Sequence, residues 1–201
     1  MPTTKILTAS GAAIAPYLAD LARLRIEVFR HWPYLYEGNM DYELAYLKTY
    51  VSSPRSICVL VQAEGKIVGA STGLPLIDET AEFQAPFMCA GWDIQKLFYF
   101  GESVLLPAYR SQGLGHEFFN YRQQHAQGFN CFTHTTFAAV ERPLNHPLRP
   151  TNYTDHAEFW RKRGYTHQPQ LAMQLSWPEI GAAEASTKTL SFWLRPEPVQ
   201  L

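Results

Sequence analysis

The sequence predicts an α/β (α+β) fold, in which strands and helices are interspersed along the chain. Residues 97–127 have the pattern of a buried strand, a glycine-bearing turn and an amphipathic helix. Residues 56–76 contain two β-branched, apolar runs joined by Glu64-Gly65, which is typical of a β-hairpin. Shorter strand and helix patterns lie on both sides of these two segments, which favours a mixture of both element types over an all-helical or all-strand protein.

The first fifty residues are expected to form a strand and two helices. Residues 5–9 have the composition of a short strand. A helix then ends near Arg30, because apolar residues recur at helical spacing along one face. These are Ile14, Tyr17, Leu18, Leu21, Leu24 and Val28. A second helix is expected at residues 41–50, and Ser52-Ser53-Pro54 ends it.

The central part of the chain is expected to hold the hairpin, an excursion and the strand–turn–helix unit. The hairpin strands are predicted at residues 56–62 and 66–76. Residues 77–95 are acidic and rich in turn formers, with a few apolar anchors, and long excursions of this kind are often functional lids. The strand of the next unit is predicted at residues 97–106, and its helix at residues 113–127.

The last third of the chain is expected to return to the sheet three times. The predicted elements are a strand at 130–140, a proline-rich loop at 141–150, a helix at 155–163, a strand at 165–177, a polar connector at 178–188 and a last strand at 189–195. No internal repeat or low-complexity tract is evident in the sequence. We therefore expect one domain that comprises residues 1–201.

Composition excludes several classes of protein. Hydrophobic residues make up 46% of the chain and charged residues 17%, which is typical of a folded domain. The net charge is −1, from 17 basic and 18 acidic residues, so no broad nucleic-acid surface is expected. The three cysteines and seven histidines show neither disulfide nor metal-ligand spacing. No signal peptide or membrane span is evident, and we expect a cytoplasmic protein.

The turn between the strand at 97–106 and its helix reads Arg110-Ser111-Gln112-Gly113-Leu114-Gly115. Its glycines leave backbone N–H groups accessible at a helix N-terminus, where unpaired donors and the helix dipole favour a phosphate. A P-loop needs Lys and Ser or Thr after the last glycine, but His116-Glu117 follow here. A dinucleotide fingerprint needs a third glycine, which this turn does not have.

The turn instead resembles the pyrophosphate-binding motif of the GNAT superfamily of acyl-CoA N-acyltransferases, which is Arg or Gln, two free positions, Gly, one free position, and Gly or Ala. Residues 64–70 resemble a hairpin common in that family, and Phe159–Tyr165 resembles its late helix and turn. The order of predicted elements also matches over nearly the full length. The resemblance implies a mixed, mostly antiparallel sheet with flanking helices, in which the strands at 97–106 and 130–140 splay apart.

The resemblance also implies an N-acetyltransferase that moves an acetyl group from acetyl-CoA to a primary amine of a small molecule or peptide. The donor would lie between the splayed strands, with its pyrophosphate on the glycine turn. The residues expected to bind it are Val104, Leu105, Leu106, Arg110, Ser111, Gln112, Gly113, Leu114, Gly115 and His116. No metal or membrane is expected to take part, and a homodimer is left open.

A general base is needed to take the proton from the amine. Glu102 is the first candidate, because a carboxylate within a buried strand, near Phe100 and Val104 on one face, is expected to have a raised pKa. The family often has a glutamate at this point of the strand. The alternative for Glu102 is a structural ion pair with an arginine. Glu141, beyond the neighbouring strand, is the second candidate, with a solvated loop position as its alternative.

The general acid departs from the family pattern. Many GNAT enzymes protonate the departing thiolate with a tyrosine of the late helix, and the position that matches it here is Trp160. An indole N–H donates hydrogen bonds but is no practical proton source at neutral pH. Protonation would then fall to water, to Tyr153, to Tyr165 or to no group at all, and either tyrosine has a core position as its alternative.

The acceptor pocket is expected in the aromatic segment that links the first two helices. Trp32, Tyr34, Tyr36 and Glu37 offer cation–π and carboxylate contacts that suit an amine, and packing of the segment against the core is the alternative. Two other functions stay open. One is a non-catalytic acyl-CoA-binding module, which Trp160 favours. The other is an acyl-homoserine-lactone-type synthase, which residues 24–29 faintly resemble.

Overall fold

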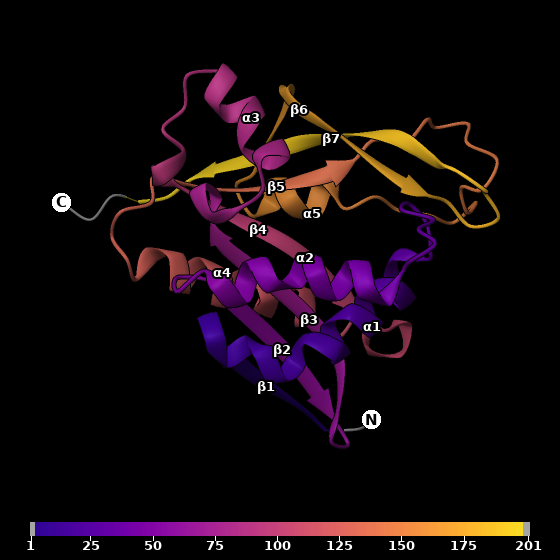
Figure 1. Ribbon diagram of the computed structural model, residues 1–201, viewed down its shortest axis with the longest axis horizontal. Coiled ribbons are helices and arrows are strands. Elements are labelled where there is room, and N and C mark those ends of the chain that lie inside the picture. The colour runs from indigo at the N-terminus through magenta and orange to yellow at the C-terminus, as the bar shows by residue number, and fades with distance from the viewer. Residues whose placement is uncertain (1–2, 199–201) are drawn as a thin grey trace.

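A computed structural model describes residues 3–198 and contains one seven-stranded sheet with helices on both faces (Figure 1). The strands are β1 (Thr4–Ala9), β2 (Ile57–Ala63), β3 (Lys66–Pro75), β4 (Leu97–Leu105), β5 (His134–Val140), β6 (Thr166–Pro178) and β7 (Ala185–Pro196). The helices are α1 (Leu18–Phe29), α2 (Met40–Ser52), α3 (Ala81–Cys89), α4 (Leu114–Gln127) and α5 (Ala157–Lys162). Short 3₁₀ turns precede α1, α3, β4 and α4.

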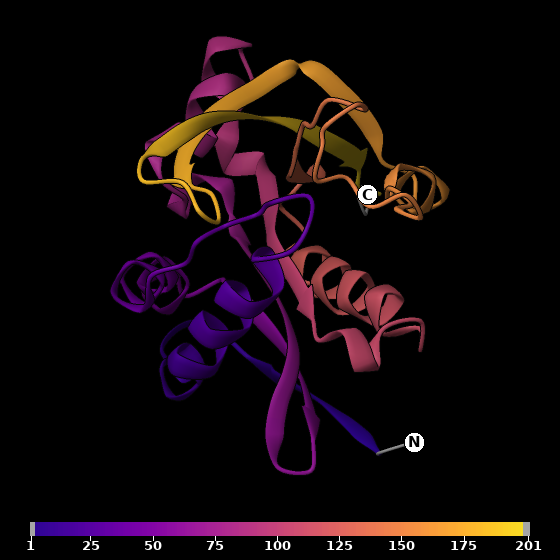
Figure 2. The same ribbon diagram turned by 90° about the vertical axis from the view of Figure 1, so that its right-hand side faces the viewer.

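The strand order is β1-β2-β3-β4-β5-β7-β6, and the only parallel neighbours among residues 3–198 are β4 and β5. These two strands pair from Leu97↔His134 to Tyr99↔Thr136 and then separate, although β4 continues to Leu105 and β5 to Val140. In Figure 2 the β6–β7 hairpin arches away from the half of the molecule that holds β1 to β4. The predicted mixed sheet with splayed central strands is confirmed.

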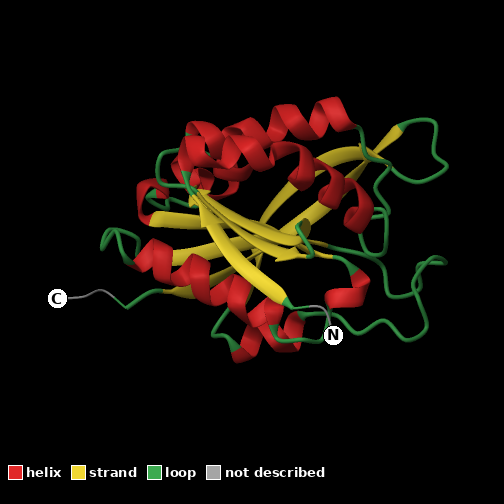
Figure 3. Ribbon diagram, turned by 90° about the horizontal axis from the view of Figure 1, so that it is seen from below, coloured by secondary structure: helices red, strands yellow, loops and turns green. Residues whose placement is uncertain are grey.

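Two apolar cores lie on opposite faces of the sheet, between it and the helices seen above and below it in Figure 3. One core includes Leu24 of α1, Tyr50 of α2 and Phe87 of α3. The other includes Phe118 of α4, with Phe159 of α5 packed against it. Helices α1, α2 and α3 therefore cover one face, whereas α4 and α5 cover the other.

A β-bulge interrupts β4 at the point where it has left β5. Ser71 of β3 pairs with Ser103, but Gly73 pairs with Phe100, so two residues of β4, Gly101 and Glu102, lie opposite one residue of β3. The extra residue reverses the alternation of side chains. Glu102 consequently shares the α1–α2 face with Val104, whereas Phe100 lies in the core under α4. The expectation that Glu102 and Phe100 share a face was wrong.

The excursion between β3 and β4 is a packed helical insertion rather than a turn-rich loop. It contains α3, and its aromatic anchors bury themselves against the sheet. The Phe83 ring lies 5.1 Å from that of Tyr99, and the Phe87 ring lies 4.7 Å from that of Phe192. The polar connector predicted at 178–188 is also shorter than expected, because β7 already begins at Ala185 and pairs there with Pro178.

Candidate functional site

The start of α4 follows β4 after a short 3₁₀ turn and the glycine turn, at the end of β4 where it has separated from β5. Gly113 has φ of 80°, a left-handed conformation that favours glycine, and it forms the N-cap of α4. Among residues 3–198 no side chain caps this helix. A Cβ placed on Gly113 or Gly115 would meet no atom of the described chain within 4 Å. The N–H groups of His116 and Glu117 donate to Gly113 O, whereas those of Leu114 and Gly115 have no acceptor in the described part of the chain. These two donors are open to a ligand, which fits a phosphate.

The polar side chains of the turn brace the backbone of the turn itself. Arg110 Nε donates to Leu105 O at 3.0 Å, and Gln112 Nε2 donates to Ala108 O at 3.2 Å. Both residues are exposed, as is Ser111, which has a φ of 61°. Leu114 is buried under the turn. These contacts hold the shape of the loop and leave its outer surface free.

The other predicted donor-binding residues differ in how they face the gap. Val104 is buried in the core under α1 and α2, so only its backbone is available to a ligand. Leu105 and Leu106 are partly buried. His116, on the first turn of α4, is exposed, and its Nδ1 lies 3.1 Å from Arg163, just after α5.

Glu102 is held in an ion pair with Arg25 of α1. Arg25 NH1 lies 2.5 Å from Glu102 Oε2, and Arg25 Nε also pairs with Glu43 Oε2 of α2. Both carboxylate side chains are at most 1% exposed, and each has a second oxygen without a hydrogen-bond partner in the described part of the chain. One guanidinium thus serves two buried carboxylates, and the structural ion pair considered for Glu102 is present.

A third carboxylate, Glu79, enters the buried centre that Arg25, Glu43 and Glu102 form, and it comes from the start of the insertion. Glu79 Oε1 accepts hydrogen bonds from the hydroxyls of Tyr46 and Tyr50, at 3.3 and 3.4 Å. Burial raises the pKa of Glu79 to about 7, and the nearby Glu102 acts in the same direction. Sequence reasoning missed Glu79, although the Asp78-Glu79 pair stands out beside the apolar end of β3.

Arg122 of α4 supports the bulge from the opposite face. Its NH1 donates to Thr72 O at 3.2 Å and to Glu102 O at 3.4 Å, and its NH2 donates to Ser103 Oγ at 2.9 Å. Burial lowers the pKa of Arg122 to about 10. The guanidinium therefore binds carbonyl groups around the bulge and keeps Glu102 aimed at the α1–α2 face.

The segment predicted to bind the acceptor divides into a buried and an exposed part. Tyr34 is packed between Phe29 and Trp177, with ring distances of 4.5 and 6.0 Å. Burial raises the pKa of Tyr34 to about 12, with Arg25 and Glu102 among its neighbours. Tyr36 is buried as well, and burial raises its pKa. Glu37 is exposed and pairs with Arg30 at 2.7 Å, so the structure does not bring it to Glu102.

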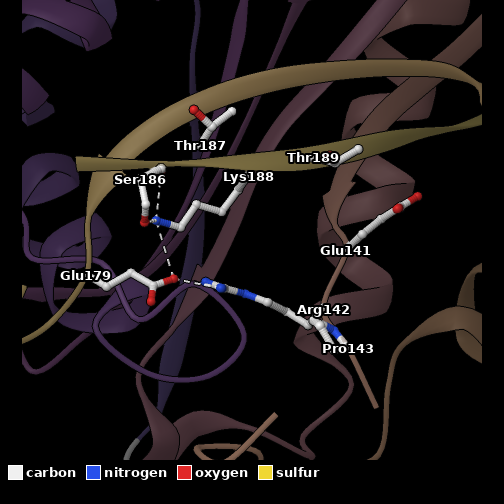
Figure 4. A pocket seen from close by; sticks show the side chains of 8 residues that line it. All are labelled: Glu141, Arg142, Pro143, Glu179, Ser186, Thr187, Lys188 and Thr189. Atoms are coloured by element: carbon white, nitrogen blue, oxygen red, sulfur yellow. Dashed lines mark hydrogen bonds and ion pairs between the residues drawn. The ribbon is translucent and has the colours of Figure 1, made fainter. Parts of the chain in front are cut away.

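Arg142, just after β5, fastens this segment to the β6–β7 hairpin. It donates to Pro33 O at 2.7 Å and to Tyr34 O at 2.8 Å, and its NH1 lies 2.6 Å from Glu179 Oε1. Lys188 of β7 points to the same carboxylate, at 3.4 Å (Figure 4). These groups border a pocket of about 540 Å³. Its lining residues are Glu141, Arg142, Pro143, Glu179, Ser186, Thr187, Lys188 and Thr189.

The remaining acid–base candidates lie outside the buried centre. Glu141 is exposed and points away from Glu179 (Figure 4). Tyr153 is half-buried and packs edge-on against Trp32, whose ring centroid is 5.9 Å away. Tyr165 is a core residue, hydrogen-bonded to Thr135 Oγ1 at 2.9 Å.

Trp160, at the position of the usual tyrosine, packs into the sheet face that α5 covers. Its ring lies 4.9 Å from Phe137 and 5.1 Å from Trp193. The indole is partly buried and contributes to packing around β5 and β7, against the core on this face.

Two negative findings concern the described part of the chain. None of its helices combines the length and the apolar character needed to cross a bilayer. Within residues 3–198, no three or more His, Cys, Asp or Glu side chains are grouped so that they could hold a metal ion.

Comparison with known proteins gives a family match. The model of the acetyltransferase (GNAT) family matches residues 24–165, which include the bulge, the glycine turn and α5. A comparison with curated proteins gives no match.

Solved structures of acetyltransferases share the fold. An acetyltransferase from Thermus thermophilus is 14% identical, with a TM-score of 0.57 over 98% of this chain and 100% of that one. An acyl-CoA N-acyltransferase from Pseudomonas aeruginosa is 14% identical, with a TM-score of 0.56 over 96% and 99%. A Salmonella typhimurium protein solved with its cofactor acetyl-CoA is 12% identical, with a TM-score of 0.57 over 98% and 95%.

Proposed function

The chain belongs to the GNAT acetyltransferase family, and from this membership we propose that it is an N-acetyltransferase. It would move an acetyl group from acetyl-CoA to a primary amine of a small molecule, and residues 1–201 would act as one domain. The observation that carries the proposal is the uncapped, sterically open start of α4, which adjoins the gap between β4 and β5.

The donor site follows from this geometry. Backbone groups of residues 104–106 would bind the pantetheine arm, and the turn at 110–116 would bind the pyrophosphate. The Salmonella typhimurium protein with the same fold contains acetyl-CoA, which supports this donor over other thioesters. Bound acetyl-CoA supplies a reactive thioester carbonyl, so the protein has to position the amine and remove its proton.

The acceptor side is rich in buried carboxylates. Glu43 and Glu102 share a single cation, Arg25, so this cluster carries one negative charge in excess when both are ionised. The unpaired oxygens of these carboxylates would be satisfied by an ammonium group. Tyr34, which is close enough to influence both Arg25 and Glu102 electrostatically, would line the same space. A cationic amine is therefore the acceptor that these groups support best.

A non-catalytic acyl-CoA-binding module is the second candidate, because Trp160 occupies a packing position where many relatives have a proton-donating tyrosine. Thioester turnover distinguishes the two functions. Release of free CoA that depends on an added amine requires the enzyme, whereas binding of acetyl-CoA with no release favours the module.

The substitution Gly115→Val tests the donor site. A side chain at Gly115 meets no atom of the described chain within 4 Å, so the fold should be kept while the space for the pyrophosphate is filled. We expect calorimetry to show acetyl-CoA binding by the wild type and a loss of at least about 100-fold in affinity for the variant, which is about 2.7 kcal/mol at 1.36 kcal/mol per tenfold change.

Gly91→Val provides the matched control, because Gly91 also has open space around it but lies in the insertion. Its left-handed φ of 78° makes the control the more strained of the two variants. Equal affinities of Gly115→Val and the wild type, with thermal unfolding unchanged, would remove the turn from the donor site.

A further inference from the structure

Glu79, in the insertion between β3 and β4, is a buried carboxylate that has no role in the donor or acceptor site proposed above. Glu79 is 5% exposed. Its Oε2 accepts a hydrogen bond from Thr80 N–H at 2.8 Å, and its Oε1 accepts from the hydroxyls of Tyr46 and Tyr50. These hydroxyls are 3.3 Å from each other. The carboxylate is therefore held by hydroxyls and an amide rather than by a cation.

The Tyr50 hydroxyl connects Glu79 to the β-bulge. A Cβ at Gly101 would clash with Tyr50 Oη and with Thr72 Oγ1, so the hydroxyl occupies space that only a glycine leaves free. The bulge lies beyond Tyr99, where the pairing of β4 with β5 has ended. Tyr50 thus spans the distance from the opened part of β4 to a buried proton acceptor.

Groups from three elements surround the Glu79 carboxyl. Helix α2 contributes Tyr46 and Tyr50, β4 contributes Glu102 and Tyr99, and α1 contributes Arg25. The pKa of Glu79 is raised to about 7, because burial and the nearby Glu102 raise it by more than the Thr80 N–H, Tyr46 and Arg25 lower it. A carboxyl with such a pKa exchanges its proton near neutral pH, as a general base does.

On the premise of the proposed function, we propose that Glu79 receives the proton that the acceptor ammonium must lose, through the hydroxyl of Tyr50. The ammonium N–H bond breaks and its electron pair stays on nitrogen. The Tyr50 oxygen takes this proton, while its own proton passes to Glu79 Oε1. The carboxylate becomes a carboxylic acid, the neutral amine becomes the nucleophile, and Glu79 later returns the proton to solvent.

This assignment gives Glu102 a different task from the one expected from the sequence. Glu102 remains paired with Arg25, and its free oxygen attracts the ammonium group of the acceptor. Glu79, which has no such cationic partner at hydrogen-bond distance within residues 3–198, is the carboxylate that changes its protonation state.

The pH dependence of kcat/KM tests this proton relay from the acceptor through Tyr50 to Glu79. Putrescine, lysine, tyramine and glucosamine are the acceptor probes. For every probe that the wild type acetylates, kcat/KM should rise with pH through an ionisation near 7. In Glu79→Gln this rise of kcat/KM with pH should be absent, and kcat/KM at a pH of about 8 should be lower than in the wild type by about 100-fold or more. Tyr50→Phe should also lower kcat/KM. Glu79→Asp, which keeps a carboxyl, should retain the step at a reduced rate.

Asp78→Asn is the matched control. Asp78 lies next to Glu79 and accepts a hydrogen bond from Ser53 Oγ at 2.6 Å, so it anchors the same turn to the end of α2. This variant should keep the pH step, because the anchor is not part of the relay. A Glu79→Gln variant that keeps both the rate and the step overturns the inference, as does a Glu102→Gln variant that alone removes the step.

An NMR titration gives a readout independent of turnover. In protein with ¹³C-labelled glutamate carboxyl groups, one signal should titrate near pH 7 in the wild type and be missing in Glu79→Gln. No such signal would overturn the inference. A wild type that binds acetyl-CoA yet acetylates none of the four probes counts instead against the proposed function, so the two failures are distinguishable.

Discussion

Arg25 is the residue on which the charge of the buried centre depends. Its guanidinium pairs with both Glu43 and Glu102, and it lies over the rings of Phe29 and Tyr46 at 5.1 and 4.6 Å from their centroids. Desolvation opposes the charge on Arg25, but the two carboxylates outweigh it and its pKa is raised. The arginine that pairs with Glu102 thus comes from a helix 77 residues earlier in the chain.

Replacement of Arg25 by Met should destabilise the protein strongly. It would leave two buried carboxylates without a cation, and breaking a buried pair in this way costs about 3–5 kcal/mol. Urea unfolding measures the loss. Arg23→Met is the control, because the ion pairs of Arg23, with Asp20 and Glu27, are exposed, and such pairs contribute about 0–1 kcal/mol. Equal stability of the two variants would mean that Arg25 is not needed to compensate the carboxylates.

At the scale of elements, the strand–turn–helix unit formed by β4, the glycine turn and α4 organises the donor site. Its strand carries the bulge, its turn leaves the start of α4 open, and its helix supplies Arg122, which holds the bulge from behind. The unit therefore links the proposed binding of the donor to the orientation of Glu102.

Arg110→Ala should weaken acetyl-CoA binding without unfolding the protein. Arg110 is exposed and donates to Leu105 O, so it supports the turn or meets the phosphates directly. Loss of a hydrogen bond to a charged group corresponds to roughly 1.5–3 kcal/mol, which calorimetry resolves. Lys48→Ala removes an exposed cation of α2 and should leave the affinity unchanged. If both variants bind like the wild type, Arg110 is only a solvated surface residue.

At the scale of the whole molecule, folding buries the carboxyl group of Glu79 in a site that disfavours its charged form. The pKa of Glu79 is raised from its usual 4.5 to about 7, mainly by burial between α2, α3 and the sheet. A raised pKa means that the folded state binds the proton more tightly than the unfolded state does. The contribution of Glu79 to the free energy of unfolding is therefore fully present below pH 4.5, and it is lost as the pH rises through 7.

Glu79→Gln should consequently gain stability relative to the wild type as the pH rises. A rise in pKa from 4.5 to about 7 corresponds to roughly 3 kcal/mol at full ionisation, at about 1.4 kcal/mol per pH unit. Denaturant unfolding between a pH of about 4.5 and about 8.5 should show the difference between variant and wild type growing by up to that amount. A difference that is constant with pH would mean that Glu79 titrates normally. Glu82→Gln, exposed on α3, serves as the control.

The sequence by itself determined the features that depend on neighbouring residues. Alternating and helical apolar patterns located all seven strands and four of the five helices near their observed positions, and the glycine spacing located the open start of α4. Glu64-Gly65 formed the predicted turn, with both residues at positive φ. These features are local because a period of 2 or 3.6 and a left-handed φ are set within a few residues.

Only the tertiary structure decided which distant side chains meet. The pairing of Arg25 with Glu102, the contact of Glu79 with Tyr50 and the packing of α3 all join segments far apart in the sequence. One extra residue in β4 moved Glu102 to the opposite face of the sheet from the one its alternation with Phe100 predicts. The β-bulge and these long-range contacts arise from the packing of the whole chain, so local periodicity does not reveal them.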